Sequence, residues 1–190
     1  VDAGVFEKMT IPKEIEIIEP TGSPCNLLVV APHGVIHDDD HTAPLARGLA
    51  QCLNGYAIIN ERYRKPGTVE LQFSDPGRLL VNLNDHRQIM KHDEIVEEFI
   101  EPIQDAIHRI KKRHGTVLIV LVHGIAGRNI AAVAREMAEY EARPEDLHLL
   151  MGFGQSDRGS SKLTANKEDM VIPLLKSLHS LGINGAIAPI

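Results

Sequence analysis

The sequence predicts an α/β fold, a three-layer α/β/α arrangement around a mostly parallel mixed sheet. Short apolar runs rich in β-branched residues alternate with longer segments whose apolar residues recur at helical spacing, which is typical of this class. The runs at 27–31 (LLVVA) and 116–122 (TVLIVLV) are apolar throughout, as expected of parallel strands buried on both faces. Polar residues follow both runs directly, and ligand sites of such sheets form beyond the carboxyl ends of the strands.

The expected elements follow from these periodicities in chain order. Isoleucines alternate with glutamates at 14–17, which predicts an edge strand there, and 116–122 is expected to be a central strand. Thr42 is a candidate N-cap for the first helix, and Pro102 is expected to kink or restart the second. The remaining predicted strands are 27–31, 56–60, 147–152 and 183–189, and the predicted helices are 43–53, 93–113, 129–141 and 167–181.

Length and composition favour a single α/β domain over residues 1–190. The chain is 43% apolar and 24% charged, which is ordinary for a soluble globular protein. A net charge of −6 without a basic stripe argues against nucleic acid as a partner. No apolar run approaches the roughly 20 residues of a membrane span. Two cysteines are too few for a disulfide scaffold, so we expect a reduced, cytoplasmic setting. Nothing in the sequence determines the oligomeric state.

Two histidines follow two predicted strands at equivalent positions. His33 follows 27–31, His123 follows 116–122, and each precedes a glycine. Because the carboxyl ends of adjacent parallel strands meet at one edge of a sheet, the two imidazoles are expected to lie close together. One such histidine alone would more often only bind a backbone carbonyl. The occurrence of both, with an acidic cluster beside the first, favours a shared ligand.

The aspartates at 38–40 complete a candidate zinc site. A run of like charges is usually a solvated loop, but three adjacent carboxylates repel one another and a cation would relieve that repulsion. Catalytic zinc typically takes two histidines and one carboxylate and leaves a position for water. The sequence therefore predicts zinc bound by His33, His123 and one of these aspartates, with His37 and His41 as spare ligands or supporting groups.

Polar residues on two predicted loops are candidate substrate contacts. Arg62, Arg64 and Arg87 are of a type that is usually only solvated at the surface, but arginine can also clamp a carboxylate through two parallel hydrogen bonds. Asn82 and Asn84 interrupt an otherwise apolar run, which suits substrate binding and a polar turn equally. We predict a small-molecule substrate with a carboxylate that Arg62 or Arg87 binds and that Asn84 helps to orient.

A weaker pattern supports a different class of protein. Gly152, Gly154 and Gly159 match a dinucleotide-binding glycine motif only loosely, with one extra spacing and no following acidic residue. A phosphate- or nucleotide-binding α/β domain is therefore an alternative interpretation. Ser160 and Ser161 lack the GxSxG motif, which disfavours a serine hydrolase.

Four motifs together resemble a known family: APHG at 31–34, the acidic loop before Thr42, RLLVNLN at 78–84 and LVHG at 121–124. The chain resembles the N-formylglutamate amidohydrolases, and within them the poly-γ-glutamate hydrolase branch related to zinc carboxypeptidases. The resemblance implies a zinc-peptidase (phosphorylase/hydrolase)-like fold and a zinc-dependent amidohydrolase that cleaves an N-acyl amino acid or a γ-glutamyl substrate. It also implies zinc ligands at His33, His123 and one aspartate. Counting back from Thr42 favours Asp39, which we prefer, whereas counting forward from His33 favours Asp38.

The chain departs from the family pattern in two places. The family's D-x-N-R segment corresponds to 82–85, where Asn82 replaces the aspartate and Asp85 replaces the arginine, with Arg87 two residues later. The family also uses a catalytic glutamate on a late strand, and no glutamate follows Glu168 here. The base then comes from elsewhere, or lies in a C-terminal part outside this sequence, or is missing. A missing base would make the chain a catalytically degenerate, metal-binding relative.

Overall fold

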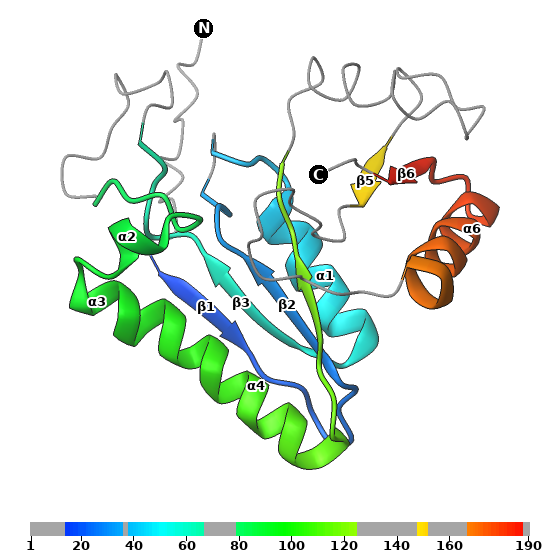
Figure 1. Ribbon diagram of the computed structural model, residues 1–190, viewed down its shortest axis with the longest axis horizontal. Coiled ribbons are helices and arrows are strands. Elements are labelled where there is room, and N and C mark those ends of the chain that lie inside the picture. The colour runs from blue at the N-terminus through cyan, green and yellow to red at the C-terminus, as the bar shows by residue number, and fades with distance from the viewer. Residues whose placement is uncertain (1–13, 36–37, 67–78, 125–147, 152–166, 188–190) are drawn as a thin grey trace, which may run out of the picture. The chain divides into compact units, whose positions relative to one another are not determined.

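The computed structural model describes residues 14–35, 38–66, 79–124, 148–151 and 167–187 (Figure 1). The chain divides into two compact units, Val1–Gly124 and Ile125–Ile190. The first unit contains a mixed sheet with helices packed on it, which confirms the α/β class. The expectation of a single domain stays a prediction.

A four-stranded sheet forms the centre of the first unit. Its strands are β1 (Ile15–Ile18), β2 (Leu27–Ala31), β3 (Tyr56–Asn60) and β4 (Leu118–Leu121), in the order β1-β3-β2-β4. β1 runs antiparallel to β3, whereas β2 is parallel to both of its neighbours. The strands predicted at 27–31 and 56–60 and the edge strand predicted at 14–17 are confirmed. The prediction that 116–122 is central is wrong for the described sheet, because β4 lies at its edge and alternates between half-buried and exposed residues.

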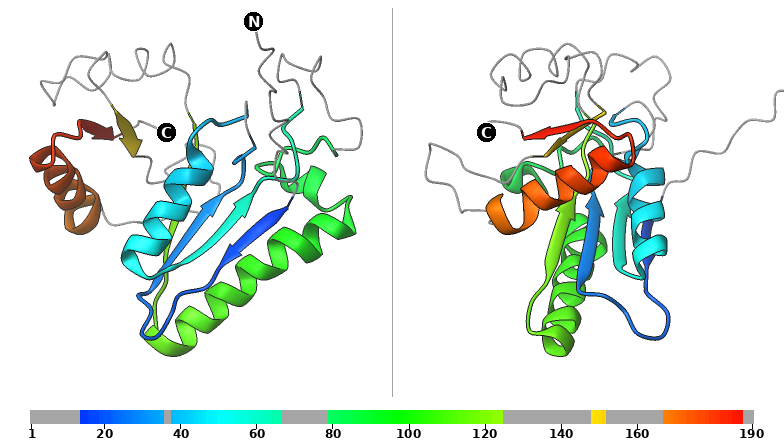
Figure 2. Two further views of the ribbon diagram at one scale, coloured as in Figure 1. Left: turned by 180° about the vertical axis from the view of Figure 1, so that it is seen from behind. Right: turned by 90° about the vertical axis from the view of Figure 1, so that its right-hand side faces the viewer.

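Helices cover both faces of this sheet (Figure 2). α1 (Thr42–Leu53) buries Ala43, Ala46 and Ala50 against one face, where their small side chains allow a close approach to β2 and β3. α4 (Glu101–His114) buries Ala106 and Ile110 against the opposite face. Successive residues of a strand point to opposite faces, so every residue of β2 is buried by one helix or the other.

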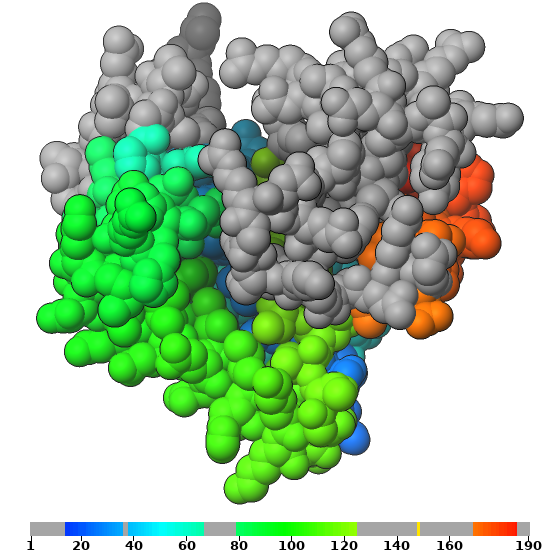
Figure 3. Space-filling model, in the orientation of Figure 1, coloured from blue at the N-terminus to red at the C-terminus, as the bar shows by residue number. Residues whose placement is uncertain are grey.

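The predicted helix at 93–113 is interrupted as Pro102 led us to expect. α3 (Asp93–Ile95) passes into the π-helical turn η2 (Val96–Ile100), and α4 begins just before Pro102. Proline has no N–H to donate and its ring crowds the preceding turn, so the regular hydrogen-bond ladder is broken there. The side chains of α2 (His86–Ile89), α3, η2 and α4 form one continuous surface of the unit (Figure 3).

The second unit contains a small parallel strand pair and a helix. β5 (Leu149–Met151) pairs with β6 (Gly185–Ile187), and the turn η4 (Lys167–Val171) leads into α6 (Ile172–Ser180). These elements confirm the strands and the helix predicted in this region. The helix predicted at 129–141 and the glycine-containing segment 152–161 lie outside the described residues. Within the described ranges, no helix is long and apolar enough to cross a bilayer.

Gly34 occupies a position with no room for a side chain. A Cβ there would lie 2.9 Å from the Cβ of Ala43 and 2.9 Å from the carbonyl oxygen of Asn60. We expect Gly34→Ala to lower the free energy of unfolding by about 1–3 kcal/mol through overpacking. Gly48→Ala in α1 is the control, because its Cβ meets nothing within 4 Å. That variant should gain up to about 1 kcal/mol from helix propensity. Equal denaturant midpoints for the two variants would contradict this account.

Candidate metal centre

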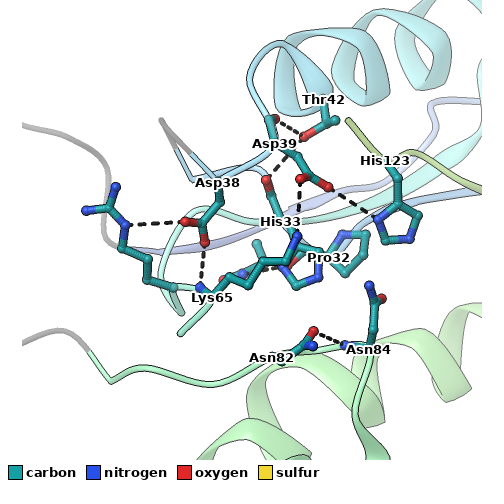
Figure 4. Close-up of polar contacts among 11 residues, drawn as sticks. Pro32, His33, Asp38, Asp39, Thr42, Lys65, Asn82, Asn84 and His123 are labelled. Carbon is teal, nitrogen blue, oxygen red and sulfur yellow. Dashed lines mark hydrogen bonds and ion pairs between the residues drawn. The ribbon is translucent and has the colours of Figure 1, made fainter. Parts of the chain in front are cut away.

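The structure brings His33, Asp39 and His123 together beyond the carboxyl ends of β2 and β4 (Figure 4). The two imidazole ring centroids are 5.7 Å apart, and Nδ1 of His123 lies 3.4 Å from Oδ2 of Asp39. Two imidazoles that share one zinc ion at ordinary bond lengths have centroids about 5 Å apart. The spacing of the histidines therefore suits a shared ion, although no three His, Cys, Asp or Glu side chains of the described residues already form a metal-binding group.

His33 is the most unusual side chain of this cluster. It is fully buried, and neither ring nitrogen has a hydrogen-bond partner in the part of the chain that the structure describes. Leaving a buried polar atom unpaired costs about 1–3 kcal/mol. Burial lowers the pKa of His33, and the nearby charge of Lys65 lowers it further, against the opposing effect of Asp39. His33 is therefore neutral at pH 7, the form in which imidazole binds a metal ion.

Asp39 carries the negative charge of the cluster. It is only 6% exposed, and its burial works to raise the pKa of the carboxyl group. Hydrogen bonds with His123 and with the backbone of Gly124, together with the charge of Lys65, outweigh burial and leave the pKa of Asp39 below its ordinary value. The group is thus an ionised carboxylate beside two imidazoles, which is the donor set predicted for zinc.

Asp38 points away from the histidines. Its side chain is fully buried, and Oδ2 accepts a hydrogen bond of 2.5 Å from the backbone N–H of Lys65. Oδ1 lies 3.3 Å from Nε of Arg64. Because these two residues engage both oxygens of Asp38, the geometry favours Asp39 over Asp38 as the metal ligand. Of the further candidates, His41 is exposed, and His37 lies outside the described residues.

Thr42 stabilises the loop that carries Asp39. The N-cap of α1 is His41, in the left-handed conformation with φ 70°, so the prediction that Thr42 is the N-cap is wrong. Instead, the Thr42 hydroxyl donates a hydrogen bond of 2.8 Å to the carbonyl oxygen of Asp39. Gly124 packs on the same loop, and a Cβ there would lie 3.0 Å from the Cβ of Asp39. The glycine after His123 therefore allows the loops that carry Asp39 and His123 to approach each other.

Of the predicted substrate-binding residues, only Asn84 points toward the histidines (Figure 4). It lies on the turn before α2, where its N–H donates to the side chain of Asn82. Arg62 donates to both carboxylate oxygens of Glu98, at 2.5 and 2.6 Å, so its guanidinium is engaged away from the centre. Arg87 is exposed at the start of α2, where its N–H donates to Asp85.

Sequence reasoning missed two residues that shape the centre. Lys65 places Nζ 3.5 Å from Oδ1 of Asp39. Asn60 is fully buried, and its amide group donates to the carbonyl oxygens of Pro32 and Tyr63 and accepts from the N–H groups of Arg62 and Tyr63. A signal was present for Asn60, because a polar residue ends an otherwise apolar strand. The sequence carried no comparable signal for Lys65.

No family model, curated protein or solved structure matches this chain. The family resemblance drawn from the sequence motifs therefore stays a prediction.

Asn60→Leu tests the amide that joins the ends of β2 and β3. Leucine has the same branched skeleton of side-chain heavy atoms, although it is bulkier, and it leaves the carbonyl groups of Pro32 and Tyr63 buried without their donor. We expect the free energy of unfolding to fall by about 2–4 kcal/mol. Asn26→Leu is the control, because the Asn26 side chain makes one exposed hydrogen bond of 3.3 Å to Thr116, and it should lose less than about 1 kcal/mol. Similar losses in the two variants would show that Asn60 has no special structural role.

The metal-free protein should become less stable as the pH falls from 7.5 to 5.5. Because the pKa of His33 is lower in the folded than in the unfolded state, the unfolded chain binds the proton more readily, and acid favours unfolding. The loss begins near the ordinary histidine pKa of 6.5 and approaches at most about 1.4 kcal/mol per pH unit. In urea unfolding experiments with a chelator present, the free energy of unfolding of His33→Gln should depend less steeply on pH than that of the wild type. His108→Gln, on the exposed face of α4, should keep the wild-type dependence, and a wild-type slope for His33→Gln would refute the assignment.

Proposed function

We propose that this protein is a zinc-dependent amidohydrolase that cleaves an amide bond of an N-acyl amino acid or a γ-glutamyl substrate. The observation that carries the proposal is the buried, neutral His33, whose ring nitrogens have no partner among the described residues, beside His123 and an ionised Asp39. The sequence motifs that resemble those of the N-formylglutamate amidohydrolases suggest the reaction and the class of substrate. The proposal includes the three-layer, zinc-peptidase-like arrangement implied by that resemblance.

His33, Asp39 and His123 are the residues that would hold the ion. A bound zinc ion supplies Lewis-acid polarisation of a carbonyl group and activation of water at neutral pH. The protein contributes a buried setting in which charges act strongly on a bound substrate, because His33 and Asp39 are shielded from solvent. The amide side chain of Asn84, which points toward the histidines, would orient the substrate by hydrogen bonding.

A second candidate is a metal-binding protein without hydrolase activity. It is favoured by the contacts of Asp38, the carboxylate next to Asp39 in the chain, both of whose oxygens are engaged. Arg64 and the Lys65 backbone engage Asp38, so this neighbour of Asp39 is not presented as a general base. Nucleotide or phosphate binding, the third interpretation, depends on glycines at 152–159 that lie outside the described residues.

Zinc titration of site variants tests the ligand set. Wild-type protein is expected to bind one zinc ion per chain. His33→Ala and Asp39→Asn should weaken binding at least about a hundredfold, because the first removes a nitrogen donor and the second replaces a charged carboxylate with a neutral amide. Asp40→Asn is the matched control, since Asp40 is exposed in the same acidic run and should leave the affinity unchanged. A stoichiometric ion retained by Asp39→Asn but lost by Asp38→Asn would overturn the assignment of Asp39.

Turnover separates the candidate functions. Zinc-loaded protein is assayed for amine release from N-formyl-L-glutamate, N-acetyl-L-glutamate and γ-glutamyl dipeptides. Release that a chelator abolishes and zinc restores supports the hydrolase. Zinc binding without release supports the degenerate relative, and thermal protection by nucleotide without zinc binding supports the third interpretation.

A further inference from the structure

Lys65 brings a positive charge into the candidate metal centre from the loop after β3. Its Nζ lies 3.5 Å from Oδ1 of Asp39, while His123 lies beside the other oxygen, Oδ2 (Figure 4). The carboxylate of Asp39 is therefore shared between an imidazole and an ammonium group. The Lys65 side chain is 36% exposed, so solvent or a ligand can reach it.

The backbone around Lys65 is fixed by contacts on both sides. The buried carboxylate of Asp38 accepts from the Lys65 N–H and lies beside Nε of Arg64. The Arg64 backbone also forms a parallel bridge with the segment before α2, in which its N–H donates to Leu79 and its carbonyl accepts from Val81. These contacts fix the backbone from which the Lys65 side chain starts. The side chain therefore extends from a fixed position toward Asp39.

Charge balance indicates what Lys65 is for. A divalent cation held by one carboxylate and two neutral imidazoles leaves the centre with a net charge of about +1. The Lys65 ammonium would then face a like charge, which is unfavourable unless an anion lies between them. Ammonium groups are strongly hydrated point charges with several donors, which suits them to bind a carboxylate at a partly exposed position.

We propose that Lys65 is the anion-binding residue of this centre and that it holds a substrate carboxylate beside the bound metal ion. The inference rests on the proposed function and names its specificity-determining residue. Lys65 then binds the substrate carboxylate, the role that the sequence suggested for Arg62 or Arg87. Arg62 is instead paired with Glu98, and Arg87 is exposed at the start of α2. The centre therefore selects acylated amino acids with a free carboxylate over neutral amides of the same shape.

Zinc affinity gives the first test, without any turnover. In calorimetric titrations without added carboxylates, Lys65→Met should bind zinc about tenfold more tightly than the wild type, because the ammonium no longer competes for Asp39. Lys112→Met, an exposed position in the last turn of α4, is the control and should bind zinc as the wild type does.

Ligand preference gives the second test on the zinc-loaded protein. The probes are N-acetyl-L-glutamate and N-acetyl-L-glutamine amide, in which neutral carboxamides replace both carboxylates. Wild-type protein should prefer the acid, and Lys65→Met should lose about tenfold or more of that preference while binding the amide equally well. Lys65→Arg retains the charge and should keep most of the preference. It serves as the conservative control, which distinguishes loss of the charge from misfolding of Lys65→Met. Arg62→Met should also keep it.

The outcomes separate this inference from the proposed function. If the wild type binds no zinc, both the proposed function and the role of Lys65 are refuted. If it binds zinc but Lys65→Met keeps the wild-type zinc affinity and ligand preference, only the carboxylate-binding role of Lys65 is refuted. Loss of the preference in Arg62→Met instead would assign the carboxylate to Arg62 and overturn the inference.

Discussion

One buried amide donates two hydrogen bonds and accepts two, and these hold together the end of the first unit that carries the candidate metal centre. The Asn60 side chain binds the backbone at Pro32, just before His33, and the backbone of Arg62 and Tyr63 in the loop that leads to Lys65. The amide uses both donors and its acceptor oxygen, so its burial carries no unpaired group. The ends of β2 and β3 thus become one support, from which His33 and Lys65 project.

Close packing imposes a second constraint on the same region. Gly34 lies against α1 and the end of β3, where a Cβ would clash, and Gly124 lies against Asp39, where a Cβ would make a tight contact. Each glycine follows a histidine directly, and the His-Gly pair therefore combines a candidate ligand with a residue small enough for a neighbouring segment to approach closely. Close packing of this kind stabilises His33 in its buried position, where its ring nitrogens have no partner among the described residues.

The acidic run has two different environments within three residues. Asp38 and Asp39 are turned inward and face a basic segment, where Arg64 and Lys65 balance their charge. Only Asp40 has the exposed position that a run of like charges usually indicates. The local charge balance explains how two adjacent carboxylates are tolerated at low exposure, and it places an ammonium group where an anionic ligand would be held.

The sequence by itself determined the strands at 27–31 and 56–60, the first helix, the interruption at Pro102 and the proximity of His33 to His123. These features depend on periodicity and on strand ends, which are local properties of the chain. Only the tertiary structure decided that Asp39 rather than Asp38 faces His123, that Arg62 pairs with Glu98 and that Lys65 lies beside Asp39. It also decided that β4 lies at the edge of the sheet formed by the described strands. Adjacent residues on a loop point in different directions, and their partners come from segments as far as 84 positions away, so no local pattern specifies them.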